Sequence, residues 1–227
     1  MEIRGSGLFA GKGLGDAGDR VANRFILEAL AQARPGDAIL SEEEQDSAAR
    51  LSAERVWIVD PLDGTREYRE GRSDWAVHVA LAIAGEAAAG AVALPALGLT
   101  LASDLPPALP PAPAGAPRML VSRSRPAEPP VRVAQAIGAE LVAMGSAGAK
   151  AMAVVRGEAE IYLHTGGQHE WDNCAPAAVA AAAGLHVSRV DGSPLAYNRA
   201  DPYLPDLLIC RPELAAQVLA LVAEARE

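Results

Sequence analysis

A proline-rich stretch in the middle of the chain limits the folds that the sequence can adopt more than any other feature. Residues 104–117 (DLPPALPPAPAGAP) contain six prolines. Proline lacks a backbone N–H and fixes φ, so this stretch can form neither a helix nor a central strand. We therefore expect residues 104–117 to link an N-terminal part, residues 1–103, to a C-terminal part, residues 118–227. The alternative is a long surface loop within one domain.

Both parts mix strand and helix patterns, which indicates the α/β or α+β class. Glycines dominate residues 1–18 and predict a loop there, and Asp19 is placed to cap a helix ending near Arg34. In the first part, strands are predicted at 38–41, 55–60, 75–84 and 88–94. In the second part, strands are predicted at 118–122, 140–144, 159–164, 185–190 and 206–210, and helices at 130–137, 147–156, 172–183 and 212–225. The strand at 185–190 is expected to pair with the segment after the Asp191-Gly192 turn.

Composition excludes several classes of protein. The chain has 227 residues, is 50% hydrophobic and carries a formal net charge of −9. An acidic chain does not bind nucleic acid by a general electrostatic footprint. No apolar run reaches the roughly 18 residues that a membrane span needs. Two cysteines form no disulfide framework, and the N-terminus lacks the pattern of a signal peptide, so we expect a cytoplasmic protein.

Two carboxylates follow a strand that is predicted to be buried. In Asp60-Pro61-Leu62-Asp63-Gly64-Thr65, the proline is expected to end the strand and Gly64 permits a tight turn. Such a turn can direct Asp60, Asp63 and the Leu62 carbonyl to one point. Carboxylate and carbonyl oxygens are the ligands that Mg²⁺ prefers. Taken alone, this pattern is also that of an ordinary turn.

Further acidic residues follow other predicted elements. Glu42, in the run Ser41-Glu42-Glu43-Glu44, can reach the same cation if its strand neighbours that of Asp60. Asp172 opens a predicted helix and could cap it, bind metal, or do both. An acidic run is usually a solvated face, and an Asp before a helix is usually a cap. Several carboxylates at the ends of core elements nevertheless repel one another unless cations neutralise them.

These segments carry a family resemblance. The order S-E-E, then D-P-L-D-G-T, then W-D in WDNCAPAAVAAAAG resembles the inositol-monophosphatase superfamily from about Leu14 onward. The resemblance implies a layered αβαβα sandwich of two subdomains, with two or three Mg²⁺ ions in the active site. The family starts with an extra helix, whereas this sequence begins within the glycine-rich segment, so we expect an effect on stability or on formation of a homodimer.

The resemblance also implies a role for each matching position. Glu42, Asp60 and the Leu62 carbonyl resemble ligands of one Mg²⁺, and Asp60, Asp63 and Asp172 resemble ligands of a second. Asp19 lies where a family aspartate stands near a third metal. Thr65 with Glu43 resembles the pair that orients the nucleophilic water. None of the four histidines is expected to take part.

Two further segments resemble the CysQ-like 3′(2′),5′-bisphosphate nucleotidases within the superfamily. These are Gly64-Thr65-Arg66-Glu67-Tyr68 and Ser122-Arg123-Ser124-Arg125. Met144 to Lys150 (MGSAGAK) follows a strand and opens a helix, whose N–H groups can bind an anion. Lys150 is displaced from its place in the branch pattern G-S-S-L-K. The expected substrate-binding residues are Gly64, Thr65, Ser122, Arg123, Gly145, Ser146, Lys150 and Asp172. The alternative for Arg123 and Lys150 is a solvated surface cation.

The resemblance therefore implies a small-molecule phosphate substrate. The expected reaction is hydrolysis of adenosine 3′,5′-bisphosphate to AMP and phosphate, which clears a by-product of sulfate assimilation. An inositol-1-phosphate or fructose-1,6-bisphosphate phosphatase would use the same fold and metals. A catalytically inactive phosphate-binding protein is the alternative from another class. Inhibition by Li⁺ is a further expectation of the family.

Overall fold

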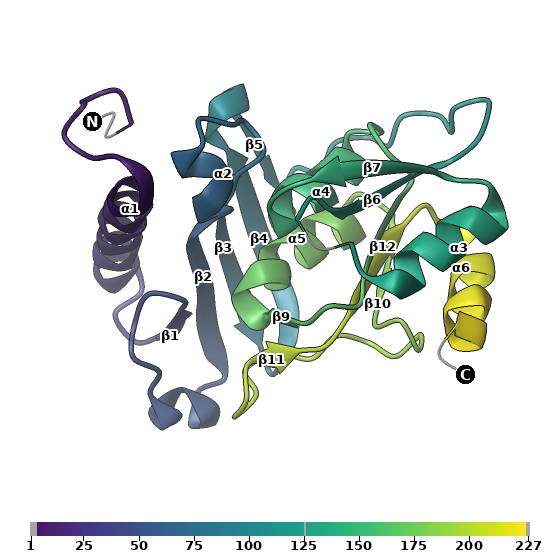
Figure 1. The fold of residues 1–227 in the computed structure, drawn as a ribbon. Helices are drawn as coiled ribbons and strands as arrows, with labels where there is room; N and C mark the ends of the chain where they lie inside the picture. The colour runs from purple at the N-terminus through teal and green to yellow at the C-terminus, as the bar shows by residue number, and fades with distance from the viewer. Residues whose placement is uncertain (1–3, 125, 226–227) are drawn as a thin grey trace.

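Helical and sheet layers alternate through the molecule in the order αβαβα. A computed structural model describes residues 4–124 and 126–225. Helix α1 (Gly11–Ala33) lies outside the first sheet, and α4 (Ala147–Val155) and α5 (Glu170–Ala182) lie between the two sheets. Helices α3 (Glu128–Ile137) and α6 (Pro212–Ala225) cover the outer side of the second sheet (Figure 1). This layering confirms the predicted fold class.

The first sheet has the strand order β1-β2-β3-β4-β5. Its strands are β1 (Ala38–Ser41), β2 (Arg55–Asp63), β3 (Ala76–Ile83), β4 (Glu86–Leu94) and β5 (Leu99–Ala102). Only β1 and β2 run parallel; the other pairs are antiparallel. The prediction that β2 ends at Pro61 was wrong, because a register shift between Asp60 and Asp63 accommodates the proline within the strand. A short helix, α2 (Thr65–Arg69), follows directly.

The second sheet has the order β10-β12-β8-β6-β7. Its strands are β6 (Arg118–Ser122), β7 (Glu140–Met144), β8 (Ile161–His164), β10 (His186–Ser188) and β12 (Leu207–Cys210). Strand β10 pairs with β12, and the expected pairing with the segment after Asp191-Gly192 is limited to the Arg189 N–H, which donates to the Ser193 carbonyl at 2.8 Å. That segment instead runs to α5, where Asn198 and Arg199 donate their N–H groups to Glu170. The remaining elements are a two-residue ribbon of β9 (Gln168–His169) with β11 (Tyr203–Leu204), and two 3₁₀ turns at Ala48–Ser52 and Pro95–Leu97.

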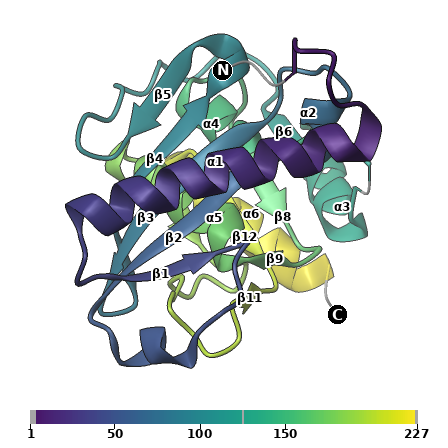
Figure 2. The same ribbon diagram turned by 90° about the vertical axis from the view of Figure 1, so that its left-hand side faces the viewer.

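Helix α1 begins eight residues before its predicted start, within the stretch that was expected to be a loop. It crosses the face of the first sheet (Figure 2). A Cβ added at Gly15 would lie 2.6 Å from Thr65 Cγ2, and one at Gly18 would lie 3.0 Å from the Tyr68 ring. Each glycine costs a helix about 1 kcal/mol relative to alanine. Close packing against α2 and β2 offsets this cost, and that packing could not be read from the local sequence.

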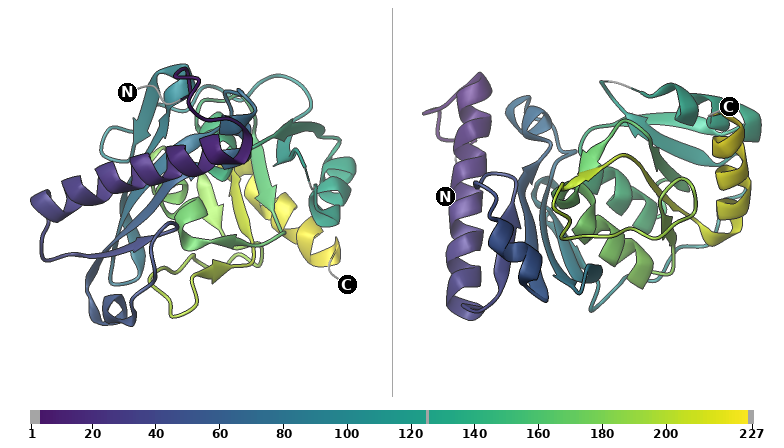
Figure 3. Two further views of the ribbon diagram at one scale, coloured as in Figure 1. Left: turned by 60° about the vertical axis from the view of Figure 1, so that its left-hand side comes forward. Right: turned by 90° about the horizontal axis from the view of Figure 1, so that it is seen from below.

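The largest hydrophobic cluster draws on both sides of residues 104–117. Ile58 and Val92 from the first sheet pack with Met152 of α4 and with Tyr162 and Leu207 from the second. The views in Figure 3 show the central helices lying between the two sheets. Small residues allow this contact: a Cβ at Gly90 of β4 would lie 2.8 Å from the Ala175 carbonyl of α5. The division into two subdomains stays a prediction. Among the described residues, no helix has the length and apolar character of a membrane span.

Candidate active site

The turn between β2 and α2 directs two carboxylates toward the central helices. The Leu62 N–H donates to Asp60 Oδ1 at 3.0 Å, which fixes the Asp60 side chain against its own turn. Gly64 has φ 89° and ψ 42°, a left-handed conformation that favours glycine. A Cβ at Gly64 would also lie 3.1 Å from Ser146 Cβ, so the turn approaches the start of α4 too closely for a side chain.

Three aspartates converge at this point. Asp60, Asp63 and Asp172 each place one carboxylate oxygen within 4.8 Å of the others. Asp172 lies in the first turn of α5, which begins at Glu170, and its Oδ2 accepts the His169 N–H at 2.6 Å. One carboxylate therefore both stabilises the helix end and faces the other two acids. Three hard oxygen ligands from three carboxylates fit a divalent cation.

Burial and repulsion between carboxylates act together on Asp60 and Asp172. Burial, followed by the negative charges of Asp63 and Glu42, raises the pKa of Asp60 well above its usual range. Burial and the charge of Asp63 likewise raise the pKa of Asp172. Carboxyl groups in such surroundings keep protons unless a cation compensates their charge. This environment is therefore suited to a bound divalent metal.

Asp63 differs from its neighbours because the N-terminus of α4 satisfies its charge. Its Oδ2 accepts the Ser146 hydroxyl at 2.5 Å and the Gly148 N–H at 2.6 Å, and its Oδ1 accepts the Ala147 N–H at 3.1 Å. Although burial acts to raise it, contacts with His78, Ser146 and Gly148 lower the pKa of Asp63 to about 2. Asp63 is thus held ionised, and its Oδ1, which accepts one hydrogen bond among the described residues, keeps a lone pair for a cation.

Glu42 and Glu43 lie at the exposed rim of the acid group. The Glu42 N–H donates to the Val59 carbonyl at 3.2 Å, which holds this residue beside β2. Although much of the residue is exposed, burial of its carboxyl and the charge of Asp172 raise the pKa of Glu42 to about 7, opposed by a hydrogen bond with Asp60. Glu42 is outside the three converging aspartates, and its role as a metal ligand stays a prediction.

Helix α1 brings Asp19 to the Thr65 hydroxyl. Thr65 Oγ1 lies 3.3 Å from Asp19 Oδ2 and 3.1 Å from the Leu62 carbonyl oxygen. Burial, with the charge of Glu43, raises the pKa of Asp19 to about 7. Within the described residues, the buried Asp19 Oδ1 has no hydrogen-bond partner. Thr65 thus contacts Asp19 of α1, and the role of Thr65 with Glu43 in orienting the nucleophilic water stays a prediction.

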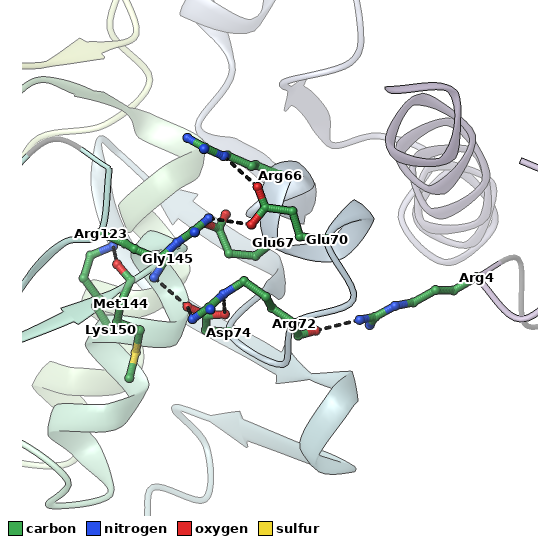
Figure 4. A network of polar contacts seen from close by, with 10 residues as sticks. All are labelled: Arg4, Arg66, Glu67, Glu70, Arg72, Asp74, Arg123, Met144, Gly145 and Lys150. Atoms are coloured by element: carbon green, nitrogen blue, oxygen red, sulfur yellow. Dashed lines mark hydrogen bonds and ion pairs between the residues drawn. The ribbon is translucent and has the colours of Figure 1, made fainter. Parts of the chain in front are cut away.

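Arg123 and Lys150 are not the solvated cations that the alternative interpretation expected. The Arg123 guanidinium binds Glu67 at 2.7 Å and Glu70 at 2.9 Å (Figure 4). Lys150 is buried, and its Nζ donates to the Ser146 carbonyl at 2.5 Å and lies 5.2 Å from the centre of the Tyr162 ring. Ser122 is half-buried at the end of β6. Contact of these residues with substrate stays a prediction.

Sequence analysis missed three residues around the site: His78, Glu67 and Asp74. His78 is fully buried opposite Asp60 in the β2–β3 pair. Its Nδ1 lies 2.9 Å from the Trp171 carbonyl and its Nε2 lies 3.2 Å from Asp63 Oδ2. Burial acts to lower the pKa of His78, but the nearby Asp63 carboxylate raises it overall. The signal was a histidine within an apolar strand, but its partner depends on strand register, which the sequence does not reveal.

A layered α/β fold with convergent buried carboxylates defines a class of divalent-metal proteins, and comparison with known proteins identifies the family. Residues 13–105 and 119–227 match the inositol monophosphatase family. The chain belongs to this family, which uses divalent metal. The gap in the match, residues 106–118, nearly coincides with the proline-rich stretch.

Two relatives and one solved structure illustrate the similarity. A 3′-phosphoadenosine 5′-phosphate phosphatase from Mycobacterium tuberculosis (strain CDC 1551) is 53% identical over 221 residues, covering 93% of this chain and 83% of the relative. The 3′(2′),5′-bisphosphate nucleotidase CysQ from Escherichia coli (strain K12) is 30% identical over 199 residues, covering 83% and 81%. Inositol monophosphatase II from Staphylococcus aureus MSSA476 shares the fold, with a TM-score of 0.79 at 20% identity, covering 94% and 84% of the two chains.

Proposed function

We propose that this chain is a Mg²⁺-dependent phosphatase that hydrolyses the 3′-phosphate of adenosine 3′,5′-bisphosphate to give AMP and phosphate. The observation that carries the reaction class is the convergence of Asp60, Asp63 and Asp172. The substrate is supported by the mycobacterial relative, which is named for this activity and is 53% identical across 93% of the chain.

The metal ligands in this proposal come from β2, α5 and the segment after β1. Asp60, Asp63 and Asp172 would hold the cations, with the Leu62 carbonyl and Glu42 as further ligands and Asp19 beside a third position. Bound Mg²⁺ would neutralise the phosphate oxygens and make water a better nucleophile at neutral pH. Glu42, Asp60 and Asp172 have raised pKa values in the absence of metal, so a bound cation would stabilise their ionised forms most.

The Asp19–Thr65 pair would handle the proton of the attacking water. Asp19 Oδ2 lies 3.3 Å from Thr65 Oγ1, and its buried Oδ1 has no hydrogen-bond partner among the described residues, so this carboxylate is placed to accept a proton. The water oxygen bonds to phosphorus as its proton passes to Asp19, the bond from phosphorus to the ribose 3′-oxygen breaks, and that oxygen takes a proton from solvent. Glu43 acts on this pair by raising the pKa of Asp19. The backbone at Gly64 and Thr65 would bind the phosphate oxygens.

The second phosphate of the substrate would bind near the ends of β6 and β7. Arg123 is more accessible than the buried Lys150, because 26% of its side chain is exposed, and the carboxylates of Glu67 and Glu70 hold it in place. Ser122, Gly145, Ser146 and Lys150 surround the same region. In this proposal Arg123→Ala lowers kcat/KM for adenosine 3′,5′-bisphosphate about tenfold but leaves that for a monophosphate nearly unchanged, since one charge-assisted pair is worth about 1.5–3 kcal/mol at most. Equal losses on both would reject the assignment of Arg123.

Two finer properties belong to the same proposal. A cytoplasmic location is supported by the two buried free cysteines, Cys174 and Cys210. A homodimer is supported by exposed apolar side chains of α1, where Val21 is 53% and Phe25 74% exposed and both line a hollow of about 580 Å³. Light scattering after gel filtration would detect the dimer, and a monomeric mass at micromolar concentration would reject it.

Metal removal tests the reaction class. Phosphate release from adenosine 3′,5′-bisphosphate should stop with EDTA, return with added Mg²⁺ and fall with Li⁺. Activity that persists with EDTA would contradict the metal-dependent mechanism. Absence of turnover under all conditions, with substrate still bound, would favour the inactive phosphate-binding alternative.

A further inference from the structure

Ser146 adopts a backbone conformation that L-residues rarely use. It has φ 54° and ψ 136° at the start of α4, where its hydroxyl accepts the Ala149 N–H at 2.9 Å and donates to Asp63. Such conformations persist only where the surroundings hold them. The contacts that hold Ser146 therefore decide whether its hydroxyl reaches Asp63.

The peptide group after Ser146 is fixed at both ends. Its carbonyl oxygen accepts from Lys150 Nζ at 2.5 Å, and its N–H, that of Ala147, donates to Asp63 at 3.1 Å. Lys150 belongs to the same helix, whereas Asp63 belongs to β2, so this clamp already joins the two parts of the chain.

The peptide group before Gly145 is also fixed at both ends, and here the first part of the chain contributes a second contact, through Asp74. The Met144 carbonyl accepts the Arg123 N–H at 3.2 Å, with Lys150 Nζ at 3.5 Å. The Gly145 N–H donates to Asp74 Oδ2 at 2.7 Å (Figure 4). Asp74 lies just before β3, 71 residues away in the sequence. This bond ties the approach to Ser146 to the first sheet.

Asp74 is well suited to be an acceptor. Its side chain is 11% exposed, and Arg72 donates to it at 2.6 and 2.8 Å. Partial burial acts to raise the pKa of Asp74, but the hydrogen bonds from Arg72 and Gly145 lower it overall. Gly145 packs closely against Glu67, because a Cβ at this position would overlap the carboxyl group of Glu67. Glu67 is itself held by Arg123.

We infer that Asp74 is a positioning residue for the metal site: it holds the Gly145 N–H and thereby keeps Ser146 in the conformation that binds Asp63. The inference rests on the proposed divalent-cation site. Asp74 is not one of the converging aspartates, so it acts through the backbone of 144–146 and through Asp63. Loss of this anchor lets Ser146 leave its rarely used conformation, so Asp63 loses the Ser146 hydroxyl as one of the donors that fix its position.

Mg²⁺ binding to the substrate-free protein, measured by calorimetry, tests this role without turnover. Asp74→Ala should weaken Mg²⁺ binding about tenfold or more, the usual scale for partners that orient a metal ligand. Asp74→Asn keeps a carbonyl oxygen at the same position and should stay within about threefold of the wild type, since a neutral acceptor replaces a charged one. The same order should appear in kcat, with KM changing less.

Two variants separate this role from loss of a surface ion pair. Arg72→Ala removes the other partner of Asp74 but leaves the acceptor for Gly145, so Mg²⁺ affinity should stay near that of the wild type. Glu28→Ala removes an exposed ion pair with Arg24, in which the Glu28 side chain is 59% and the Arg24 side chain 81% exposed. This change should leave Mg²⁺ affinity unaltered. Thermal unfolding without Mg²⁺ establishes that each variant is folded.

Several results would overturn the inference. One is a folded Asp74→Ala protein that binds Mg²⁺ like the wild type; another is Asp74→Asn binding as weakly as Asp74→Ala. If Asp74→Ala does not fold, weak binding by both Asp74→Asn and Arg72→Ala would reject it, and wild-type binding by both would support it. A wild-type protein that binds Mg²⁺ but does not hydrolyse adenosine 3′,5′-bisphosphate rejects the proposed substrate, while the Mg²⁺ affinities still decide the role of Asp74.

Discussion

Asp60 and Asp63 lie three residues apart on one strand, yet their surroundings treat their charges in opposite ways. Asp60 faces other carboxylates, and burial with their charges raises its pKa far above normal. Asp63 reaches the second part of the chain, where Ser146, Ala147 and Gly148 donate three hydrogen bonds to it. The first sheet thus supplies negative charge that needs a cation, and the start of α4 supplies donors that satisfy one carboxylate in advance.

The site is therefore preorganised at Asp63, whereas the carboxyl group of Asp60 is destabilised by burial and by its neighbours until metal binds. Asp63 accepts three hydrogen bonds from the start of α4, so it is ionised and fixed before metal binds. Asp60 and its neighbours Glu42 and Asp172 gain stabilisation only when a cation arrives. Substitutions on the two sides should therefore differ in their effect on stability even where both abolish activity.

The largest effect is expected from Asp60→Asn. Removing a ligand should lower kcat by more than about a hundredfold, the upper scale for residues that only orient ligands. The same change removes a carboxyl group that burial and neighbouring charges keep from ionising, so the metal-free protein should unfold at an equal or higher Tm. Phosphate release and thermal unfolding check the two parts, and activity within tenfold of the wild type would contradict the role of Asp60.

Asp63→Asn should also abolish turnover, but with the opposite effect on stability. The amide cannot accept all three donors of α4, and a buried unpaired group costs about 1–3 kcal/mol. Urea unfolding without metal should show this loss at pH 7. A variant as stable as Asp60→Asn would remove the distinction between the two aspartates.

Measuring the stability of the metal-free protein against pH tests the carboxylates whose pKa values are raised. Asp19 and Glu42, with pKa values raised to about 7, bind protons in the folded protein that the unfolded chain releases near pH 4. Stability of the metal-free protein should therefore fall as pH rises from about 4.5 to 7, while the contribution of Asp63, whose pKa is lowered to about 2, is lost only as pH falls below about 4.

Mg²⁺ affinity should also depend on pH, because Mg²⁺ binding displaces the protons that these carboxylates hold. Affinity should weaken between pH 8 and pH 6, by up to about tenfold per pH unit for each proton displaced. Calorimetry in buffers of different ionisation enthalpy would count the protons released. An affinity independent of pH across this range would show that the carboxylates are already ionised.

Substitutions in α1, which brings Asp19 to Thr65, are expected to have the smallest effect on activity. Gly15→Ala introduces a Cβ 2.6 Å from Thr65 Cγ2 and should cost about 1–3 kcal/mol of stability, with reduced kcat. Gly13→Ala is the matched control: nothing lies within 4 Å of its added Cβ, so it should stabilise the helix by about 0.5–1 kcal/mol. Equal effects of the two changes would show that contact between α1 and α2 is unimportant.

Local chemistry could be predicted from the sequence where the residues concerned are neighbours in the chain. The strands at 118–122 and 140–144 and the helix at 212–225 were predicted with the bounds that the structure shows, since apolar patterns and flanking Gly or Pro define them. The convergence of Asp60 and Asp63 was also predicted, because strand and turn lie in one short segment.

Long-range contacts could not be predicted in the same way. The early start of α1 depends on Thr65 packing against Gly15, and the ion pair of Arg123 depends on Glu67, 56 residues away. His78 meets Asp63 only because β2 and β3 pair in one register. Local propensity reports none of these contacts, so helix start, cation partners and histidine role all required the tertiary structure.

The most direct test of the proposed function is a comparison of kcat/KM, with Mg²⁺, for adenosine 3′,5′-bisphosphate, inositol 1-phosphate and fructose 1,6-bisphosphate. We expect adenosine 3′,5′-bisphosphate to be preferred by at least about a hundredfold, since binding groups for a second phosphate and a nucleoside add several kcal/mol. Preference for inositol 1-phosphate or fructose 1,6-bisphosphate would keep the metal site but contradict the proposed substrate.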